Sequence, residues 1–248
     1  TTSTSQTAPV MQAHQFSLDR LQALMTQEIP GFQPPLDIGQ CQGGMSNPTF
    51  VLTDGGGKRY VLRKKPPGKL LPSAHAVDRE FRAISAMRAM GLPVAEPHLL
   101  CEDETIIGQS FYIMGFADGR VFRDMRLPGM EATERTAIYD TMCETLAMLH
   151  SVDIDAAGLG DFGRIGGYVG RQIKRWSEQY IASKTDELAT MERLMTWLPE
   201  NLPDSDTTTV VHGDFRLENM IFHPTEPRVL AIVDWELATL GDPLSDLA

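Results

Sequence analysis

Two short segments near the end of the chain bring together side chains that could serve the transfer of a phosphoryl group. Residues 212–219 read HGDFRLEN, and residues 232–236 read IVDWE. Phosphoryl transfer requires a carboxylate that receives the acceptor's hydroxyl proton and oxygen ligands that hold Mg²⁺ against the phosphates. Asp214 suits the first task, and Asn219 and Asp234 suit the second, because a strand–loop–strand turn can bring them together. A polar turn with side-chain-to-backbone hydrogen bonds would explain one of these residues but not the set.

At these positions the sequence resembles the aminoglycoside-phosphotransferase and choline-kinase-like family, in which H-G-D-x-x-x-x-N is followed by a strand that ends in Asp. The resemblance implies that Asp214 is the catalytic base, that Asn219 and Asp234 bind the metal, and that Asp246 braces the catalytic loop. It also implies ATP or GTP and Mg²⁺ as cofactors. The implied fold is bilobal, protein-kinase-like and α+β, with an antiparallel sheet and one main helix in the N-lobe and a mostly helical C-lobe.

Arg216 stands two residues after Asp214, where many protein kinases keep a lysine that faces the γ-phosphate. An arginine in this place would neutralise negative charge in the transition state, which makes it a second candidate catalytic residue. A surface arginine paired with Glu218 explains the same residue equally well. The sequence leaves both interpretations open.

The first half of the chain offers groups for the nucleotide phosphates. Gly43, Gly44 and Ser46 lie in a short run between two expected strands, where backbone N–H groups could fold over phosphates. A tight hairpin is the plainer explanation of that run taken alone. Its significance rises because Arg63 follows on the third strand, on the same face as Val61.

By resemblance, this strand face places a small apolar residue against adenine and a cation against the phosphates. Arg63 replaces the lysine that is usual in the family, which is a departure from the pattern. Arginine is always charged and binds phosphate in a bidentate manner, so Arg63 remains the expected phosphate ligand.

Three further residues are candidates for the nucleotide site. Glu80 resembles the helix glutamate that pairs with the strand cation in kinases, although an exposed helix glutamate would look the same in the sequence. Residues 111–116 resemble the strand that enters the hinge, where Met114 and Phe116 would meet adenine. A plain core strand is a compatible interpretation.

The elements that must position these groups follow from hydrophobic periodicity and turn residues. In the first half the pattern predicts helices over 17–29 and 76–90 and strands over 36–42, 48–53, 59–64, 99–101 and 111–116. In the second half it predicts helices over 133–151, 168–183 and 187–197 and strands over 210–211, 220–222 and 229–233. This order predicts a disordered tail over residues 1–16, a nucleotide-binding N-lobe over 17–117 and a C-lobe over 118–248.

Composition narrows the class of partner. The chain has 22 Lys and Arg against 33 Asp and Glu, a net charge of −11, which disfavours a nucleic-acid binder. No apolar stretch approaches the ~20 residues of a membrane span. The three cysteines are far apart, so a reducing, cytoplasmic compartment fits better than a disulfide or zinc framework. Composition therefore disfavours nucleic acid and a membrane as partners, and the family resemblance implies a small hydroxylated substrate.

Within the family, residues 43–50, 66–71 and 167–176 are similar to a branch that includes kinase-like domains fused to acyl-CoA dehydrogenases. This similarity implies a hydroxyacyl-CoA acceptor. The alternatives are an aminoglycoside-type antibiotic kinase, a nucleotide-binding pseudokinase or regulatory module, and a metal-dependent hydrolase built on His212, Asp214 and His223.

Two expectations concern other parts of the chain. Residues 161–163 read DFG, the metal-binding triplet of protein kinases, but they precede the catalytic loop, so they are assigned to a loop before a helix. Family members continue for several helices beyond the motif that ends this chain. We therefore expect a truncated form of a longer polypeptide, with the acceptor pocket open on one side.

Overall fold

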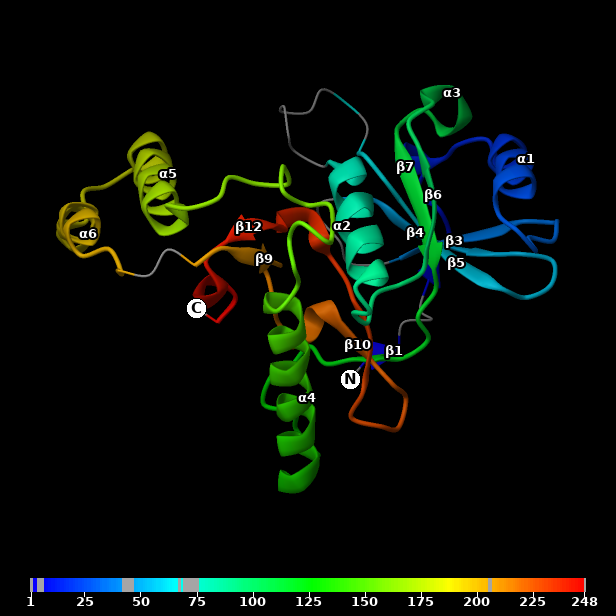
Figure 1. The fold of residues 1–248 in the computed structure, drawn as a ribbon. Coiled ribbons are helices and arrows are strands. Elements are labelled where there is room, and N and C mark those ends of the chain that lie inside the picture. The colour runs from blue at the N-terminus through cyan, green and yellow to red at the C-terminus, as the bar shows by residue number, and fades with distance from the viewer. Residues whose placement is uncertain are drawn as a thin grey trace.

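The computed structural model describes residues 2–3, 7–41, 47–66, 68, 76–204 and 207–247. Its first half is an antiparallel sheet of six strands in the order β2-β3-β4-β5-β7-β6. Their bounds are β2 Thr7–Ala8, β3 Asp37–Cys41, β4 Thr49–Thr53, β5 Arg59–Lys64, β6 Pro97–Cys101 and β7 Phe111–Gly115. Helix α2 (Val77–Ala89) lies on one face of this sheet, and α1 (Leu18–Glu28) and α3 (Glu104–Ile107) lie on the other side (Figure 1).

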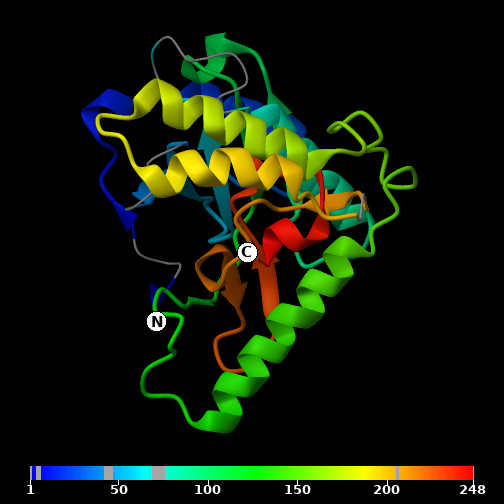
Figure 2. The same ribbon diagram turned by 90° about the vertical axis from the view of Figure 1, so that its left-hand side faces the viewer.

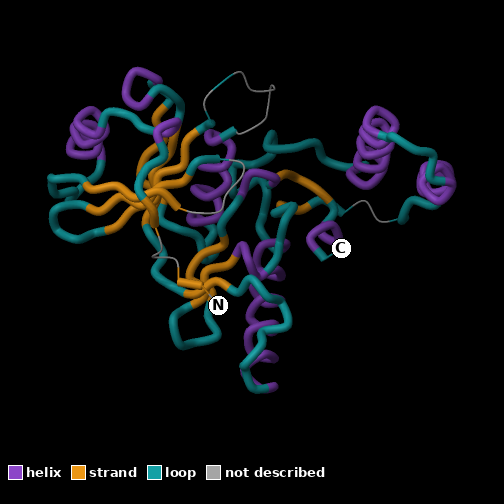
Figure 3. Tube along the Cα trace, turned by 180° about the vertical axis from the view of Figure 1, so that it is seen from behind, coloured by secondary structure: helices purple, strands orange, loops and turns teal. Residues whose placement is uncertain are grey.

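The second half is mostly helical and carries two small sheets. Helices α4 (Ala132–His150), α5 (Tyr168–Ser183) and α6 (Ala189–Glu200) are followed by β9 (Thr209–Val211), β10 (Met220–Phe222), β11 (Val229–Ile232) and β12 (Thr239–Gly241). One sheet has the order β1-β8-β10-β11, with β1 at Thr2–Ser3 and β8 at Arg120–Val121, and the other joins β12 to β9. Helices α5 and α6 pack against each other and project from the rest of the chain, whereas α4 runs beside β11 (Figure 2, Figure 3).

Short 3₁₀ turns close the loops around these strands. They are η1 (Gln12–His14), η2 (Leu217–Asn219), η3 (Trp235–Leu237) and η4 (Pro243–Asp246). Three of the four, η2, η3 and η4, follow the candidate catalytic residues Asp214 and Arg216 in the chain, so that region is built from tight turns between short strands. Such turns fix side-chain positions because few backbone dihedrals are left free.

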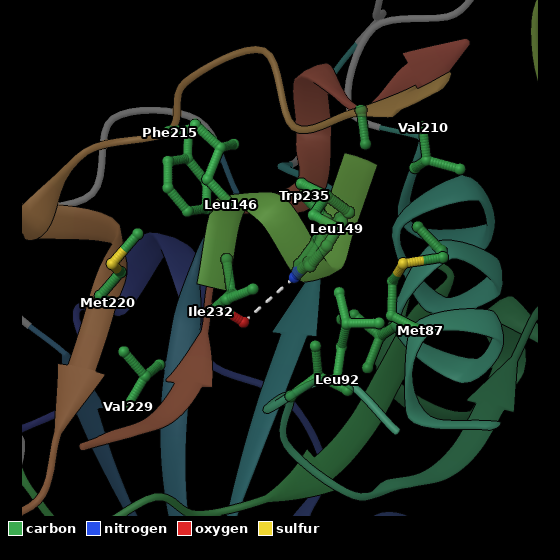
Figure 4. Close-up of a cluster of buried hydrophobic side chains, with 14 of the residues drawn as sticks. Met87, Leu92, Leu146, Leu149, Val210, Phe215, Met220, Val229, Ile232 and Trp235 are labelled. Carbon is green, nitrogen blue, oxygen red and sulfur yellow. Dashed lines mark hydrogen bonds between the residues drawn. The ribbon is translucent and has the colours of Figure 1, made fainter. Parts of the chain in front are cut away.

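The main hydrophobic core is shared by both halves of the chain. Met87 and Ile84 of α2 pack in one cluster with Trp235 of η3 and with Leu149 of α4 (Figure 4). The indole N–H of Trp235 donates to the carbonyl of Ile232 at 3.0 Å, so its burial leaves no unpaired donor. A second cluster lies on the other face of the sheet, beneath α1. Helix α2, together with Tyr112 and Met114 of β7, therefore brings the first half of the chain into one core with the second.

The predicted elements are present with boundaries that differ by a few residues, and α5 and β10 have the predicted bounds. Strands β8 and β12, helix α3 and the 3₁₀ turns were not predicted, because they are too short for periodicity and, unlike Met220–Phe222 of β10, are not uninterrupted apolar runs. The part of the predicted tail that the structure describes is not free of structure: β2 pairs with β3, and the N–H of Met11 donates to Gln40 Oε1 at 2.9 Å. In the part of the chain that the structure covers, no helix has the length and apolar character needed to cross a membrane.

Candidate active site

The loop after β9 begins with a glycine that no other residue could replace without strain. Gly213 has a φ of +83°, a left-handed conformation, and a Cβ built on it would lie 2.9 Å from both Cβ and the carbonyl oxygen of Leu237. Glycine adopts this backbone region without the steric cost that a side chain carries. The loop can therefore turn sharply beneath η3 and present Asp214 to solvent.

A buried carboxylate braces this loop from below. Asp246 accepts from the backbone N–H of His212 at 2.9 Å and of Gly213 at 2.7 Å, and its Oδ2 lies 3.0 Å from Nε2 of His150. Burial acts to raise the pKa of Asp246, but the hydrogen bonds from His150, His212 and Gly213 outweigh it and hold the pKa below its usual value. The bracing role that the resemblance implies for Asp246 fits this geometry. No sequence pattern indicated that His150, at the end of α4, takes part.

His212 joins the catalytic loop to the end of β11. Its Nε2 lies 3.0 Å from the carbonyl oxygen of Val233, and its Nδ1 accepts from the N–H of Asp214 at 3.3 Å. This pairing assigns the neutral tautomer that carries its proton on Nε2. Burial lowers the pKa of His212, although nearby Asp246 acts in the opposite direction. The residue is wholly buried, so it serves as a structural link and not as a base open to substrate.

The two expected metal ligands are brought together by the β10–β11 hairpin. Met220 is paired with Ile232, and the N–H of Val233 donates to the carbonyl of Asn219 at 2.9 Å. Asp234 follows with φ 68° and ψ 57°, a left-handed conformation that is uncommon for a residue with a side chain and is concentrated at functional sites.

Asn219 also orients the candidate base. Its Nδ2 donates to both the backbone carbonyl and Oδ2 of Asp214, each at 2.8 Å. Because the amide nitrogen is directed at Asp214, the amide oxygen is the atom that Asn219 can offer to a cation. Among the residues described, no group of three or more His, Cys, Asp and Glu side chains has the arrangement of a protein-only metal site. Two protein oxygens completed by phosphates and water are instead the usual arrangement for Mg²⁺, and Asn219 and Asp234 fit it.

Arg63 on β5 and Glu80 on α2 form the expected ion pair. Nε of Arg63 lies 3.2 Å from Oε2 of Glu80, although the geometry is not that of an aligned hydrogen bond. Glu80 also accepts from the hydroxyl of Tyr112 at 2.9 Å and from Nδ2 of Asn47 at 2.5 Å. Burial raises the pKa of Glu80, while Arg63 and these two hydrogen bonds act against that rise. Sequence reasoning missed Tyr112, although its pairing with Arg63 across β5 and β7 follows from the strand register.

Arg63 reaches across to the second half of the chain as well. One terminal nitrogen lies 3.1 Å from Oδ1 of Asp234 and 3.9 Å from Oε2 of Glu236. The candidate phosphate cation therefore contacts one of the candidate metal ligands directly. Glu236 was not singled out from the sequence, and only the fold brings it near β5.

The remaining candidate residues are Arg216, Met114 and Phe116, whose surroundings the structure describes, and three residues that it does not describe. Arg216 lies 3.4 Å from Oδ2 of Asp214 and 3.6 Å from Oε2 of Glu218, so it is beside the candidate base and paired with its neighbour at once. Met114 is buried, opposite Val61. The N–H of Phe116 donates to the carbonyl of Arg59, and the guanidinium of Arg59 lies 4.1 Å from the Phe116 ring centroid. Gly43, Gly44 and Ser46 lie outside the residues that the structure describes.

Comparisons with known proteins agree with this arrangement. A family model described as the phosphotransferase enzyme family matches residues 37–248. Acyl-CoA dehydrogenase family member 11 of Mus musculus is 49% identical over 99% of this chain and 32% of its own length, so the chain spans about a third of that relative.

Two solved structures extend the comparison. A crystal structure of a putative aminoglycoside phosphotransferase from Ralstonia eutropha is 49% identical, with a TM-score of 0.86 over 94% of this chain and 68% of the other. The streptomycin–ATP ternary complex of APH(2")-IIa has a TM-score of 0.63 at 20% identity, over 94% of this chain and 74% of the other. At that identity the second likeness shows the fold alone. The α+β fold predicted from the sequence is thereby confirmed.

Proposed function

The chain belongs to the phosphotransferase enzyme family, and we propose that it moves the γ-phosphate of ATP or GTP onto a hydroxyl of a small molecule with the help of Mg²⁺. One observation carries the proposal. Asn219 donates to Asp214 at 2.8 Å, and its carbonyl accepts from the N–H of Val233, next to Asp234. Arg63 of the sheet contacts Asp234 at 3.1 Å. A base, two oxygen ligands and a phosphate cation in one place are what phosphoryl transfer requires.

The chemical step follows from the orientation of Asp214. Asn219 holds Oδ2 of Asp214, which leaves Oδ1 to accept the proton of the acceptor hydroxyl. The hydroxyl oxygen forms a bond to the γ-phosphorus, the bond from that phosphorus to the β,γ-bridging oxygen breaks, and the nucleoside diphosphate leaves with the electron pair. Arg63 and Arg216 would balance the negative charge on the transferred group. Bound Mg²⁺ would supply further charge neutralisation at the phosphates, held by Asn219 and Asp234.

For the acceptor we propose a hydroxylated acyl-CoA. The name of the mouse relative refers to acyl-CoA, and the chain matches about a third of that protein. Helix α5 carries Lys174, Arg175 and the exposed Trp176, whose charge and apolar surface suit an anionic CoA. Arg171 on the same helix is less suited, because its guanidinium donates to the backbone carbonyls of Arg164 and Gly166.

The test is the release of nucleoside diphosphate from ATP across a panel of acceptors, with Mg²⁺ and with EDTA. The panel contains a hydroxyacyl-CoA, the free hydroxy acid, choline and kanamycin. We expect Mg²⁺-dependent release that is fastest with the hydroxyacyl-CoA. Preference for kanamycin would instead favour an antibiotic kinase, and nucleotide binding without turnover would favour a regulatory module.

The role of Asp214 is tested in the same assay. Asp214→Asn should lower turnover by roughly 10²–10⁴-fold, the usual loss on removal of a general base, and should leave the dissociation constant of MgATP unchanged. Glu226→Gln changes an exposed carboxylate between β10 and β11 and serves as the control. Unchanged turnover of Asp214→Asn at saturating acceptor would show that Asp214 is not the base.

A further inference from the structure

Two arginines on α2 contact a loop of the C-terminal half. Arg79 donates to the carbonyl oxygen of Phe162 at 2.7 Å, and its guanidinium carbon lies 4.2 Å from the centroid of the Phe162 ring. Arg82 donates to the carbonyl of Gly158 at 2.7 Å and forms an ion pair with Asp161. We call these contacts of Arg79 and Arg82 with residues 158–162 the α2 clamp. The loop contains the DFG sequence that was set aside because it precedes the catalytic loop.

This loop is itself fixed to the strand that supports the catalytic loop. The Phe162 ring is fully buried in the shared core. A Cβ on Gly163 would lie 2.7 Å from the backbone nitrogen of Leu240 and 2.7 Å from Oγ1 of Thr239, so the loop backbone is in close contact with β12. Strand β12 pairs with β9, which leads directly into His212. The α2 clamp therefore connects α2 to the sheet from which the catalytic loop starts.

The placement of the two arginines relates them to the nucleotide site. Residues three apart lie on one side of a helix, so Arg79 and Arg82 share a face. Glu80 follows Arg79 directly in the chain and is turned about 100° from it around the helix axis, toward the sheet. Glu80 holds the Arg63 guanidinium in place only if its carboxylate stays near the 3.2 Å separation from Arg63 Nε that the structure shows. Apolar packing turns the buried stripe of α2 toward the core. Hydrogen bonds to backbone carbonyls add directional constraints on the rotation of the helix.

The contacts of the α2 clamp differ in how much they contribute to holding α2 in place. The side chains of Arg82 and Asp161 are 42% and 79% exposed, and an ion pair in such a setting contributes little to stability. The directional part is the pair of hydrogen bonds to the carbonyls of Gly158 and Phe162, together with the stacking of Arg79 on the Phe162 ring. Arg79 is thus the residue whose loss should matter most.

We propose that Arg79 and Arg82 are positioning residues for nucleotide binding, which hold α2 at the rotation that places Glu80 against Arg63. The inference rests on the proposed function, because that proposal assigns the phosphates to Arg63. The residues touch neither phosphate nor acceptor; they act through Glu80. The DFG-containing loop then has a role distinct from metal binding, as the anchor of the helix that carries the ion pair.

The experiment measures the dissociation constant of MgATP by calorimetry for the parent chain, Arg79→Ala, Arg82→Ala and Arg88→Ala. Arg88 is an exposed arginine on the same helix and serves as the matched control. We expect Arg79→Ala to weaken MgATP binding by about 2- to 30-fold, the range seen for residues that couple to a site without contacting it, and Arg82→Ala to weaken it less. Arg88→Ala should match the parent. Unfolding curves without nucleotide identify any variant whose loss comes from unfolding.

A double-mutant cycle with Glu80 distinguishes a positioning effect that acts through Glu80 from a general destabilisation of α2. In a Glu80→Gln background the ion pair is already lost, so adding Arg79→Ala should change the MgATP dissociation constant by less than twofold. If Arg79→Ala has the same effect with and without Glu80, or if it has none in the parent, the inference is wrong while the proposed function stands. If the parent itself does not bind MgATP, the proposed function fails and the inference fails with it.

Discussion

Arg63, in place of the lysine usual in the family, can contact two carboxylates at once. Arg63 contacts Glu80 through Nε at 3.2 Å and Asp234 through a terminal nitrogen at 3.1 Å, so two carboxylates from different halves of the chain share one guanidinium. The fork of a guanidinium presents several donors in fixed directions, whereas an ammonium is a compact point charge. Arg63 therefore links Glu80 of α2 to the turn that carries Asp234, the proposed metal ligand.

Replacing Arg63 by lysine should reveal this linkage. Arg63→Lys keeps the charge but cannot hold both carboxylates in the same geometry, so we expect MgATP to bind about tenfold more weakly, or ~1.4 kcal/mol, close to the value of one charge-assisted hydrogen bond. Arg63→Ala should bind more weakly still. Calorimetric titration with MgATP gives both values, with Lys65→Ala, two residues further along, as the control. Equal affinity of Arg63→Lys and the parent would contradict the linkage.

His212 should make stability depend on pH. Burial lowers the pKa of His212 below 6.5, so between the two pKa values the unfolded chain binds more protons than the folded chain. The free energy of unfolding therefore rises with pH in that window. The loss of stability caused by His212 is absent well above pH 6.5 and grows below it by at most about 1.4 kcal/mol per pH unit. His14 and His98, whose pKa values are also lowered by burial, act in the same direction.

Urea unfolding between pH 5 and pH 8 measures this effect. His212→Gln keeps a donor near the carbonyl of Val233 but does not titrate, so its unfolding free energy should fall less steeply on acidification than that of the parent. The comparison of the two slopes isolates His212 from His14 and His98, which are present in both proteins. Parallel slopes would mean that His212 does not carry the predicted penalty.

At the scale of elements, hydrophobic periodicity predicted the helices and the longer strands. The HGDFRLEN motif predicted the loop between β9 and β10. Helix α5 and strand β5 have the predicted bounds because their apolar residues recur with one period between clear breaks. Strand β12 was not predicted, because Thr239–Gly241 lacks the adjacent apolar residues that mark β10 and becomes a strand through pairing with the distant β9. The same reason explains why Glu236 and His150 were missed as neighbours of the site: their partners lie 173 and 96 residues away.

The turn after β9 is the element whose backbone leaves least room for change. Gly213→Ala must adopt a φ of +83° and also place its Cβ 2.9 Å from the Leu237 carbonyl. Gly57 has a φ of +84° with nothing within 4 Å, so Gly57→Ala carries the backbone strain without the clash. We expect Gly57→Ala to lose about 1–2 kcal/mol of stability and Gly213→Ala to lose more, with a large fall in turnover. Urea unfolding and the diphosphate-release assay measure the two effects. Similar losses in both variants would show that the turn adjusts.

At the scale of the whole molecule, the proposed nucleotide site draws its residues from both halves of the chain. Arg63 and Glu80 come from the N-terminal sheet and its helix, whereas Asp214, Asn219 and Asp234 come from the C-terminal half. The shared core and the α2 clamp hold these groups at one place before any ligand binds. A ligand that contacts both halves should therefore stabilise the chain as a unit rather than one half of it.

Nucleotide and Mg²⁺ should accordingly raise the melting temperature together. At a hundredfold excess over the dissociation constant, binding contributes ~2.7 kcal/mol, which corresponds to a rise of about 5–10 °C for a chain of this size. With EDTA the rise should be smaller, because Asn219 and Asp234 then have no cation to share with the phosphates. Asp234→Asn should abolish the part of the melting-temperature rise that depends on Mg²⁺. It should keep the part that depends on ATP alone, since Arg63 is released from its 3.1 Å contact with that carboxylate.

Differential scanning calorimetry with ATP, MgATP and Mg²⁺ alone measures each part of the rise. An Mg²⁺-dependent rise that survives in Asp234→Asn would place the metal on other residues, and two separate transitions that respond differently to MgATP would show that the halves do not respond as one unit.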